Sequence, residues 1–310
     1  MKGGQGEFLK NSYLVNSNET VMEKLILKGC GTAMFTPFKD GEVDYVAMAA
    51  LTRRQVEAGM DFLVPLGTTG ETPCLSAEEK LKVFRTVKEN AGNVPVVVGV
   101  GTNSVDGTLA NIDLLKEADA FLVVTPYYNK PPQRGLYEYF KRVAAHTPKP
   151  VILYNVPGRT GCNIEASTTL KLAQDVPNII AIKEASGNIA QASAILEGKP
   201  EGFELISGND DDTLTLMRKG AAGVISVASN VCPKEMVEFT HAAQEGNWDK
   251  ADILDRRMHN LFKNLFAEPN PIPGKAAMAQ LGLMENSLRL PLVKALPETE
   301  ELMKKTLEEL

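Results

Sequence analysis

The sequence is poor in the residues that hold metals and disulfides. It contains only three histidines and four cysteines among 310 residues. His146, His241 and His259 fall in expected helices without the spacing of an H-E-x-x-H zinc motif. The cysteines form no CxxC pair, so neither a metal site nor a disulfide framework is expected. We therefore expect free thiols and a cytoplasmic protein. The acidic run at 210–212 is expected to charge the start of a helix rather than to bind a cation.

Other absences exclude whole classes of function. No apolar run approaches the roughly 20 residues of a membrane span, so no membrane association is expected. The net charge is −6 and no basic run occurs, which argues against a nucleic-acid partner. The sequence also lacks a P-loop, a G-x-S-x-G nucleophile elbow and a G-x-G-x-x-G turn after its first apolar run. ATP hydrolysis, serine hydrolase chemistry and dinucleotide binding are therefore not indicated.

The first residues are polar and lack the apolar core and small-residue cleavage site of a signal peptide. We expect residues 1–25 to form a poorly ordered leader. We also expect residues 1–21 to be dispensable, with Met22 as an internal start.

The body of the chain alternates short apolar runs with amphipathic stretches. Most runs are continuous and rich in valine and isoleucine, which is typical of parallel strands buried on both faces. Eight strand–helix units in series predict an α/β fold, a closed (β/α)8 TIM barrel over 26–232, followed by a C-terminal helical region packed on it over 233–310. An open doubly wound sheet is the alternative. The expected strands lie at 31–37, 62–67, 95–101, 121–126, 150–157, 179–185, 203–208 and 223–229.

Helices are expected between these strands. Ser76 and Glu79 form a capping box in which each side chain meets the other residue's backbone amide. Further helical patterns lie at 44–58, 104–117, 135–146, 165–174, 188–197 and 210–219.

Active sites of such barrels lie at the carboxyl ends of the strands, where Lys183 is the sharpest signal. A lysine that points into a barrel mouth loses hydration, which disfavours its charged form. A neutral amine can attack a ketone and form an imine. The alternative is a structural lysine that reaches solvent or pairs with Glu184, and the strand alone favours this alternative.

Other strand ends carry polar groups with more than one interpretation. Tyr154 can move protons beside an imine or serve as a core aromatic. Of Tyr127 and Tyr128, at most one should face a given pocket, because adjacent residues point in different directions. The turn at 67–71 (GTTGE) suits a carboxylate, or is a tight turn whose glycines supply positive φ. Arg159 could clamp a carboxylate or lie in solvent.

Taken together, these motifs resemble the dihydrodipicolinate synthase family of the pyruvate-dependent class I aldolases. The similarity runs from about residue 27 to the C-terminus, and six motifs in the family's order make it specific. They are 67–71 (GTTGE), 125–129 (TPYYN), 154–161 (YNVPGRTG), 182–184 (IKE), 223–227 (GVISV) and 268–273 (EPNPIP).

The resemblance implies a role for each of these residues. Lys183 would form the imine with pyruvate, whose carboxylate and keto region Thr69 and the backbone at Ile225 would hold. Tyr154 would exchange protons, relayed through Thr68 and through Tyr128 of a neighbouring subunit.

The remaining implied roles concern the second substrate and the assembly. Arg159 would bind the carboxylate of L-aspartate 4-semialdehyde, and Gly208 would also line the substrate site. No metal and no cofactor are implied, because the imine is the electron sink. A homotetramer, a dimer of dimers, is expected.

The resemblance also implies a regulatory cleft where lysine inhibits some family members. Sensitive bacterial members often carry histidines at the positions of Ala77 and Lys80 and a glutamate at that of Gly107, so we expect weak or no lysine inhibition here. The cleft residues would be Thr72, Pro73, Ala77, Lys80, Asn103, Gly107 and Tyr127.

Two alternatives remain at this point. A sibling aldolase, such as N-acetylneuraminate lyase or a 2-keto-3-deoxy sugar-acid aldolase, often has serine in place of Thr68 and lacks an arginine at position 159. A non-catalytic barrel would lack the lysine or the tyrosine. This chain has Thr68 and Arg159, and it has both the lysine, Lys183, and the tyrosine, Tyr154.

Overall fold

A computed structural model describes residue 25 and residues 27–310 of the chain. The expected leader, apart from Leu25, lies outside the described residues. No helix in the described part of the chain is long and apolar enough to cross a membrane.

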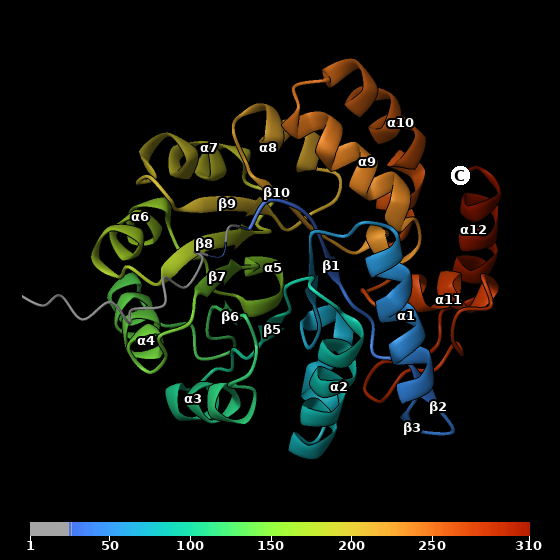
Figure 1. Ribbon diagram of the computed structural model, residues 1–310, viewed down its shortest axis with the longest axis horizontal. Helices are drawn as coiled ribbons and strands as arrows, with labels where there is room; N and C mark the ends of the chain where they lie inside the picture. Colours follow the sequence, from blue (N-terminus) through green and yellow to red (C-terminus); the bar gives the residue numbers. More distant parts are fainter. Residues whose placement is uncertain (1–24, 26) are drawn as a thin grey trace, which may run out of the picture.

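The eight long apolar runs form one parallel sheet that closes on itself (Figure 1). β10 pairs with β1, and β4 meets β5 through a parallel bridge between Leu63 and Val96. The expected barrel is therefore confirmed, and the open doubly wound sheet is wrong. The strands are β1 (Gly29–Ala33), β4 (Phe62–Val64), β5 (Val97–Gly99), β6 (Ala120–Val124), β7 (Val151–Asn155), β8 (Ile179–Glu184), β9 (Glu204–Ser207) and β10 (Gly223–Ser226).

Helices surround the sheet, and each barrel strand is followed by one of them, with the short α5 (Pro157–Thr160) as an additional helix after β7 (Figure 1). The predicted capping box is present: Ser76 Oγ accepts from the amide of Glu79, whose carboxylate accepts from the amide of Ser76. A short hairpin, β2 (Phe38–Lys39) with β3 (Glu42–Val43), precedes the first helix. The ring comprises α1 (Tyr45–Glu57), α2 (Ala77–Asn90), α3 (Val105–Leu114), α4 (Gln133–Ala145), α6 (Ala166–Asp175), α7 (Ile189–Gly198), α8 (Thr213–Arg218) and α9 (Pro233–Gln244).

Three further helices follow the ring: α10 (Trp248–Asn264), α11 (Ile272–Gln280) and α12 (Pro297–Glu308). α12 packs against α10 and α11, and α10 also packs against α9 (Figure 1). α9 packs on β1 and β10, the position of an eighth barrel helix. The division of the chain at residues 232 and 233 stays a prediction.

Two apolar clusters explain why the strand sequences are continuous rather than alternating. On β7, Ile152 and Tyr154 belong to the cluster inside the barrel, whereas Val151 and Leu153 belong to the cluster between the sheet and the helices. Both faces of each strand are thus buried, as parallel barrels require. The alternation also directs the side chain of Tyr154, near the end of β7, into the barrel.

Arg289 fastens the segment after α11 to the barrel helices. Its guanidinium donates to both carboxylate oxygens of Glu79, at 2.8 and 2.6 Å, and also to the carbonyls of Gly41 and Cys74. The hydrogen bond from Arg289 is the main reason that the pKa of Glu79 falls from 4.5 to about 2.

This pair predicts an acid-dependent loss of stability. A carboxyl whose pKa is lowered by folding stabilises the fold above its unfolded pKa, and the contribution disappears as the pH falls from about 4.5 to about 2. Urea unfolding of the wild type and of Glu79→Gln should show a gap in unfolding free energy at pH 7 that narrows steadily toward pH 2. A gap independent of pH would contradict the assigned ion pair.

Candidate active site

Lys183 lies near the carboxyl end of β8 and points into the barrel. It sits between Tyr154 on β7 and Ile206 on β9 in the strand register, and only 6% of its surface is exposed. Its ammonium nitrogen lies over the Tyr154 ring, 4.4 Å from the ring centroid. An amine and a phenol are therefore adjacent on one wall of the barrel mouth.

Glu184 does not pair with Lys183, because it faces the opposite side of the strand. Its carboxylate accepts from the Asn155 amide at 3.0 Å, from the Gln191 amide at 3.0 Å and from the backbone N–H of Ser186 at 2.7 Å. These neutral donors satisfy the buried carboxylate and tie the ends of β7 and β8 to α7. The pairing of Lys183 with Glu184 that the sequence allowed is therefore wrong, and Lys183 is left facing the mouth.

A cavity of about 380 Å³ opens at the same end of the barrel. Its walls bring together Thr68, Tyr154, Arg159 and Asn270 from three separate segments. The hydroxyls of Thr68 and Tyr154 are not hydrogen-bonded to each other, so their relay stays a prediction. Lys183 does not line the cavity but contacts Tyr154, which does.

Three other predicted residues also lie outside the cavity lining. Thr69 is 4% exposed and lies directly behind Asn270, as described below. Ile225 is fully buried on β10, and Gly208 follows β9, where its N–H donates to the carbonyl of Glu184 at 2.7 Å. The roles predicted for these residues stay predictions.

Asn270 links Thr69 to Arg159. Its side-chain amide donates to Thr69 Oγ1 at 2.9 Å, and its backbone carbonyl accepts from Arg159 Nη2 at 3.0 Å. Since the Thr69 oxygen acts as acceptor, its hydroxyl hydrogen is free to donate to an anion. The bond to Asn270 uses one of the five N–H donors of Arg159, at the exposed rim of the cavity. The site thus offers donors at two separated points.

The turn at 67–71 differs from the tight glycine turn that was the alternative. Its glycines do not have positive φ; Leu66, at 58°, and Glu71, at 51°, take the left-handed conformation instead. Two 3-10 turns, Thr68–Gly70 and Thr72–Cys74, form the connection to α2. Space at Gly70 is limited, because a Cβ there would lie 3.2 Å from Thr36 Oγ1 and 3.3 Å from the carbonyl oxygen of Met34.

The two neighbouring tyrosines point in different directions, as expected. Tyr127 lines the cavity. Tyr128 has a φ of 73°, is 88% exposed and does not reach the cavity of its own chain. A role for Tyr128 in this chemistry therefore requires a neighbouring copy of the chain.

The residues predicted for a regulatory cleft are only partly gathered. Thr72, Pro73, Lys80 and Tyr127 line the 380 Å³ cavity, whereas Ala77, Asn103 and Gly107 do not. A Cβ at position 107 would lie 2.8 Å from Thr102 Oγ1 and 2.9 Å from Ser104 Oγ, so a longer side chain would displace both hydroxyls. Burial lowers the pKa of Lys80.

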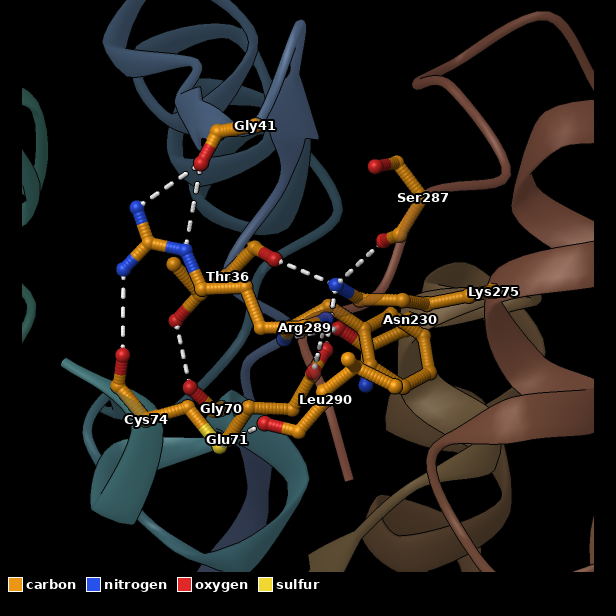
Figure 2. A network of polar contacts seen from close by, with 11 residues as sticks. Thr36, Gly41, Gly70, Glu71, Cys74, Asn230, Lys275, Ser287, Arg289 and Leu290 are labelled. Atoms are coloured by element: carbon orange, nitrogen blue, oxygen red, sulfur yellow. Dashed lines mark hydrogen bonds and ion pairs between the residues drawn. The ribbon is translucent and has the colours of Figure 1, made fainter. Parts of the chain in front are cut away.

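Behind the 67–71 turn lies a second layer of polar contacts that was not predicted from the sequence. Lys275 on α11 forms a buried ion pair with Glu71, and Arg289 donates its backbone N–H to the same carboxylate (Figure 2). A single lysine in the otherwise uncharged segment 272–280 (IPGKAAMAQ) was the available signal. In the part of the chain that the structure describes, no three His, Cys, Asp or Glu side chains group as a metal site.

Comparison with known proteins identifies the family. The model of the Dihydrodipicolinate synthetase family matches residues 26–310. The chain belongs to this family.

Relatives and solved structures of this family cover nearly the whole chain. The 4-hydroxy-tetrahydrodipicolinate synthase of Azobacteroides pseudotrichonymphae is 48% identical over 92% of this chain and 98% of its own. The dihydrodipicolinate synthase of Thermotoga maritima is 44% identical, with a TM-score of 0.89 over 91% of this chain and 98% of its own. That of Acinetobacter baumannii, crystallised with pyruvate, is 38% identical, with a TM-score of 0.89 over 92% and 99%.

Proposed function

We propose that the protein is a 4-hydroxy-tetrahydrodipicolinate synthase that condenses pyruvate with L-aspartate 4-semialdehyde. The observation that carries this proposal is a buried lysine whose amine touches a tyrosine at a cavity with an arginine on its rim. Relatives of that name at 48% identity support the same substrate pair. The A. baumannii structure with pyruvate supports pyruvate as the first substrate.

The reaction follows from the positions of these groups. The amine of Lys183 attacks the keto carbon of pyruvate and water leaves, which gives an imine. Loss of a methyl proton turns the imine into an enamine, whose carbon attacks the aldehyde of the second substrate. The amino group of the semialdehyde then displaces Lys183, closes the ring and gives (2S,4S)-4-hydroxy-2,3,4,5-tetrahydrodipicolinate. Tyr154, over whose ring the amine lies, is the proton donor and acceptor, with Thr68 and Tyr128 as relay partners.

The substrate carboxylates have separate binding groups in this proposal. Thr69 and the backbone at Ile225 hold pyruvate, and the free hydroxyl hydrogen of Thr69 suits its carboxylate. Gly208, which follows β9, is proposed to border the bound pyruvate. Arg159 takes the carboxylate of the semialdehyde, because its planar fork fits a carboxylate in bidentate fashion. The sibling sugar-acid aldolases are less favoured, since Arg159 and Thr68 line one cavity here.

The assembly is also part of the proposal. We infer a homotetramer built as a dimer of dimers, in which Tyr128 enters the cavity of a neighbour. Its 88% exposure supports this, as does the 80% exposure of Leu290, an apolar residue. A catalytic relay that depends on a neighbour would make turnover depend on assembly.

Borohydride trapping tests the imine. With pyruvate present, borohydride should inactivate the enzyme and add one reduced pyruvate unit to Lys183, because only the imine is reduced to a stable amine. Mass spectrometry of peptides from labelled enzyme locates the adduct, and Lys183→Arg should take up no label. Labelling of another lysine would refute the assignment. Turnover of N-acetylneuraminate or 2-keto-3-deoxygluconate in parallel assays, without condensation, would favour a sibling lyase.

Replacing Arg159 should separate the two substrates. Arg159→Ala should leave pyruvate labelling of Lys183 unchanged but lower kcat/KM for the semialdehyde by about 100-fold, since a charge-assisted pair is worth roughly 1.5–3 kcal/mol. Arg159→Lys should recover only part of this loss, because ammonium cannot bind in bidentate fashion. Equal losses of pyruvate labelling and of condensation would assign Arg159 to pyruvate or to folding.

Lysine should inhibit weakly or not at all. Lys80 and Ala77 offer no imidazole, and Gly107 offers no carboxylate for an ammonium group. One missing charge-assisted partner lowers affinity roughly tenfold or more. Initial rates at saturating substrates, with and without millimolar lysine, test this. Strong sigmoidal inhibition would contradict it and point to Asp106, the acidic residue in the first turn of α3, as the replacement ligand.

A further inference from the structure

The turn that carries Thr68 and Thr69 ends in a buried ion pair with the C-terminal region. Glu71 closes the turn in the left-handed conformation, with φ at 51°. Its carboxylate lies 2.5 Å from the ammonium of Lys275 on α11, and both side chains are 0% exposed. The pair joins two segments of the barrel mouth where solvent does not reach.

Both members of this pair have further partners (Figure 2). The Lys275 ammonium also donates to the carbonyls of Thr36, at 2.7 Å, and Ser287, at 2.9 Å. The other oxygen of Glu71 accepts from the backbone N–H of Arg289 at 3.1 Å. Burial lowers the pKa of Lys275 to about 8, against the opposing effect of Glu71.

The partners of Lys275 lead directly to the residues assigned to the pyruvate carboxylate. Thr36, whose carbonyl accepts from Lys275, uses its hydroxyl to bind the carbonyl of Gly70 at 2.8 Å. Two residues before α11 begins, Asn270 holds the Thr69 hydroxyl at 2.9 Å. Lys275 is therefore connected to two contacts of the turn: to the Thr69 bond through the segment that leads from Asn270 into α11, and to the Gly70 bond through Thr36.

Stability alone is a weak reason for such a pair. Removing two charges from water has a large desolvation cost, and an apolar pair of similar volume is often as stable or more stable. What an ion pair adds is a short, directional contact that fixes one arrangement of the segments it joins.

We propose that Glu71 and Lys275 are positioning residues for pyruvate, which fix the 67–71 turn so that the Thr69 hydroxyl faces the carboxylate. This rests on the proposed function, because it takes pyruvate as the ligand. Neither residue touches the reacting atoms. Their removal should therefore weaken pyruvate binding more than it changes the fold.

The test compares Glu71→Gln with the double variant Glu71→Gln, Lys275→Met. The double variant leaves no buried charge unpaired, and glutamine retains an oxygen for the amide of Arg289. The readout is the pyruvate concentration that half-saturates borohydride labelling of Lys183. It should rise about tenfold in the double variant, the effect of one weakened charge-assisted contact, and less in the single variant. The half-saturating semialdehyde concentration should stay within about twofold.

Lys199→Met is the matched control. Lys199 bonds Glu204 at 3.0 Å, follows α7 and precedes β9, and so lies at the end of the barrel opposite the mouth. The Lys199→Met substitution should lower the midpoint temperature of thermal unfolding but leave the half-saturating pyruvate concentration unchanged.

The proposal would be overturned if the folded double variant had the half-saturating pyruvate concentration of the wild type. An equal rise of this concentration in Lys199→Met would also overturn it. If the double variant is insoluble, Glu71→Gln decides by the same criterion. Wild-type enzyme that labels with pyruvate yet does not condense would refute the proposed function alone.

Discussion

The alternation of side chains at the carboxyl ends of β7 and β8, beyond the register shift near the start of the two strands, is the constraint on which the site depends. Tyr154 points inward with Ile152, and Lys183 points inward beside it in the register of β7 and β8. The residues next to them, Asn155 and Glu184, must then face the helices, where they bond each other. One alternation thus supplies an amine facing the mouth and, behind it, a satisfied carboxylate that cannot neutralise it.

The outcome at Lys183 depends on how the neighbouring charge is satisfied. Glu184 follows Lys183 in the sequence, but adjacent side chains of a strand point to opposite faces, so the two charges do not meet. Here the Asn155 and Gln191 amides and one backbone N–H satisfy Glu184 with neutral donors. The nitrogen of Lys183 lies over the aromatic face of Tyr154, a contact that holds it in place without a hydrogen bond that a substrate would have to displace.

Most of the fold could be predicted from local sequence patterns, whereas contacts between distant segments could not be predicted from the sequence. The capping box of Ser76 and Glu79 needs only residues three apart, and the strand runs need only burial on both faces, so both could be predicted. Glu71 gave no local sign of Lys275, because the pairing exists only once α11 has packed beside the turn. The alternative in which the glycines of the 67–71 turn supply positive φ failed for a related reason. Gly70 lies close to the Met34 carbonyl, a contact with a distant segment, and Leu66 and Glu71 take the positive φ values instead.

The barrel alone does not complete its own mouth, and the C-terminal segments explain how it is completed. Asn270 bonds Thr69, Lys275 bonds Glu71, and Arg289 bonds the helix that follows the turn. Barrel strands end in loops that are intrinsically mobile, and a carboxylate site needs its donors fixed to within a fraction of an ångström. Contacts from outside the barrel can fix a loop without lengthening the strands or filling the cavity. In the proposed function the helices after the barrel would act through the position of one turn, although Lys183, the lysine proposed to form the imine, lies on β8.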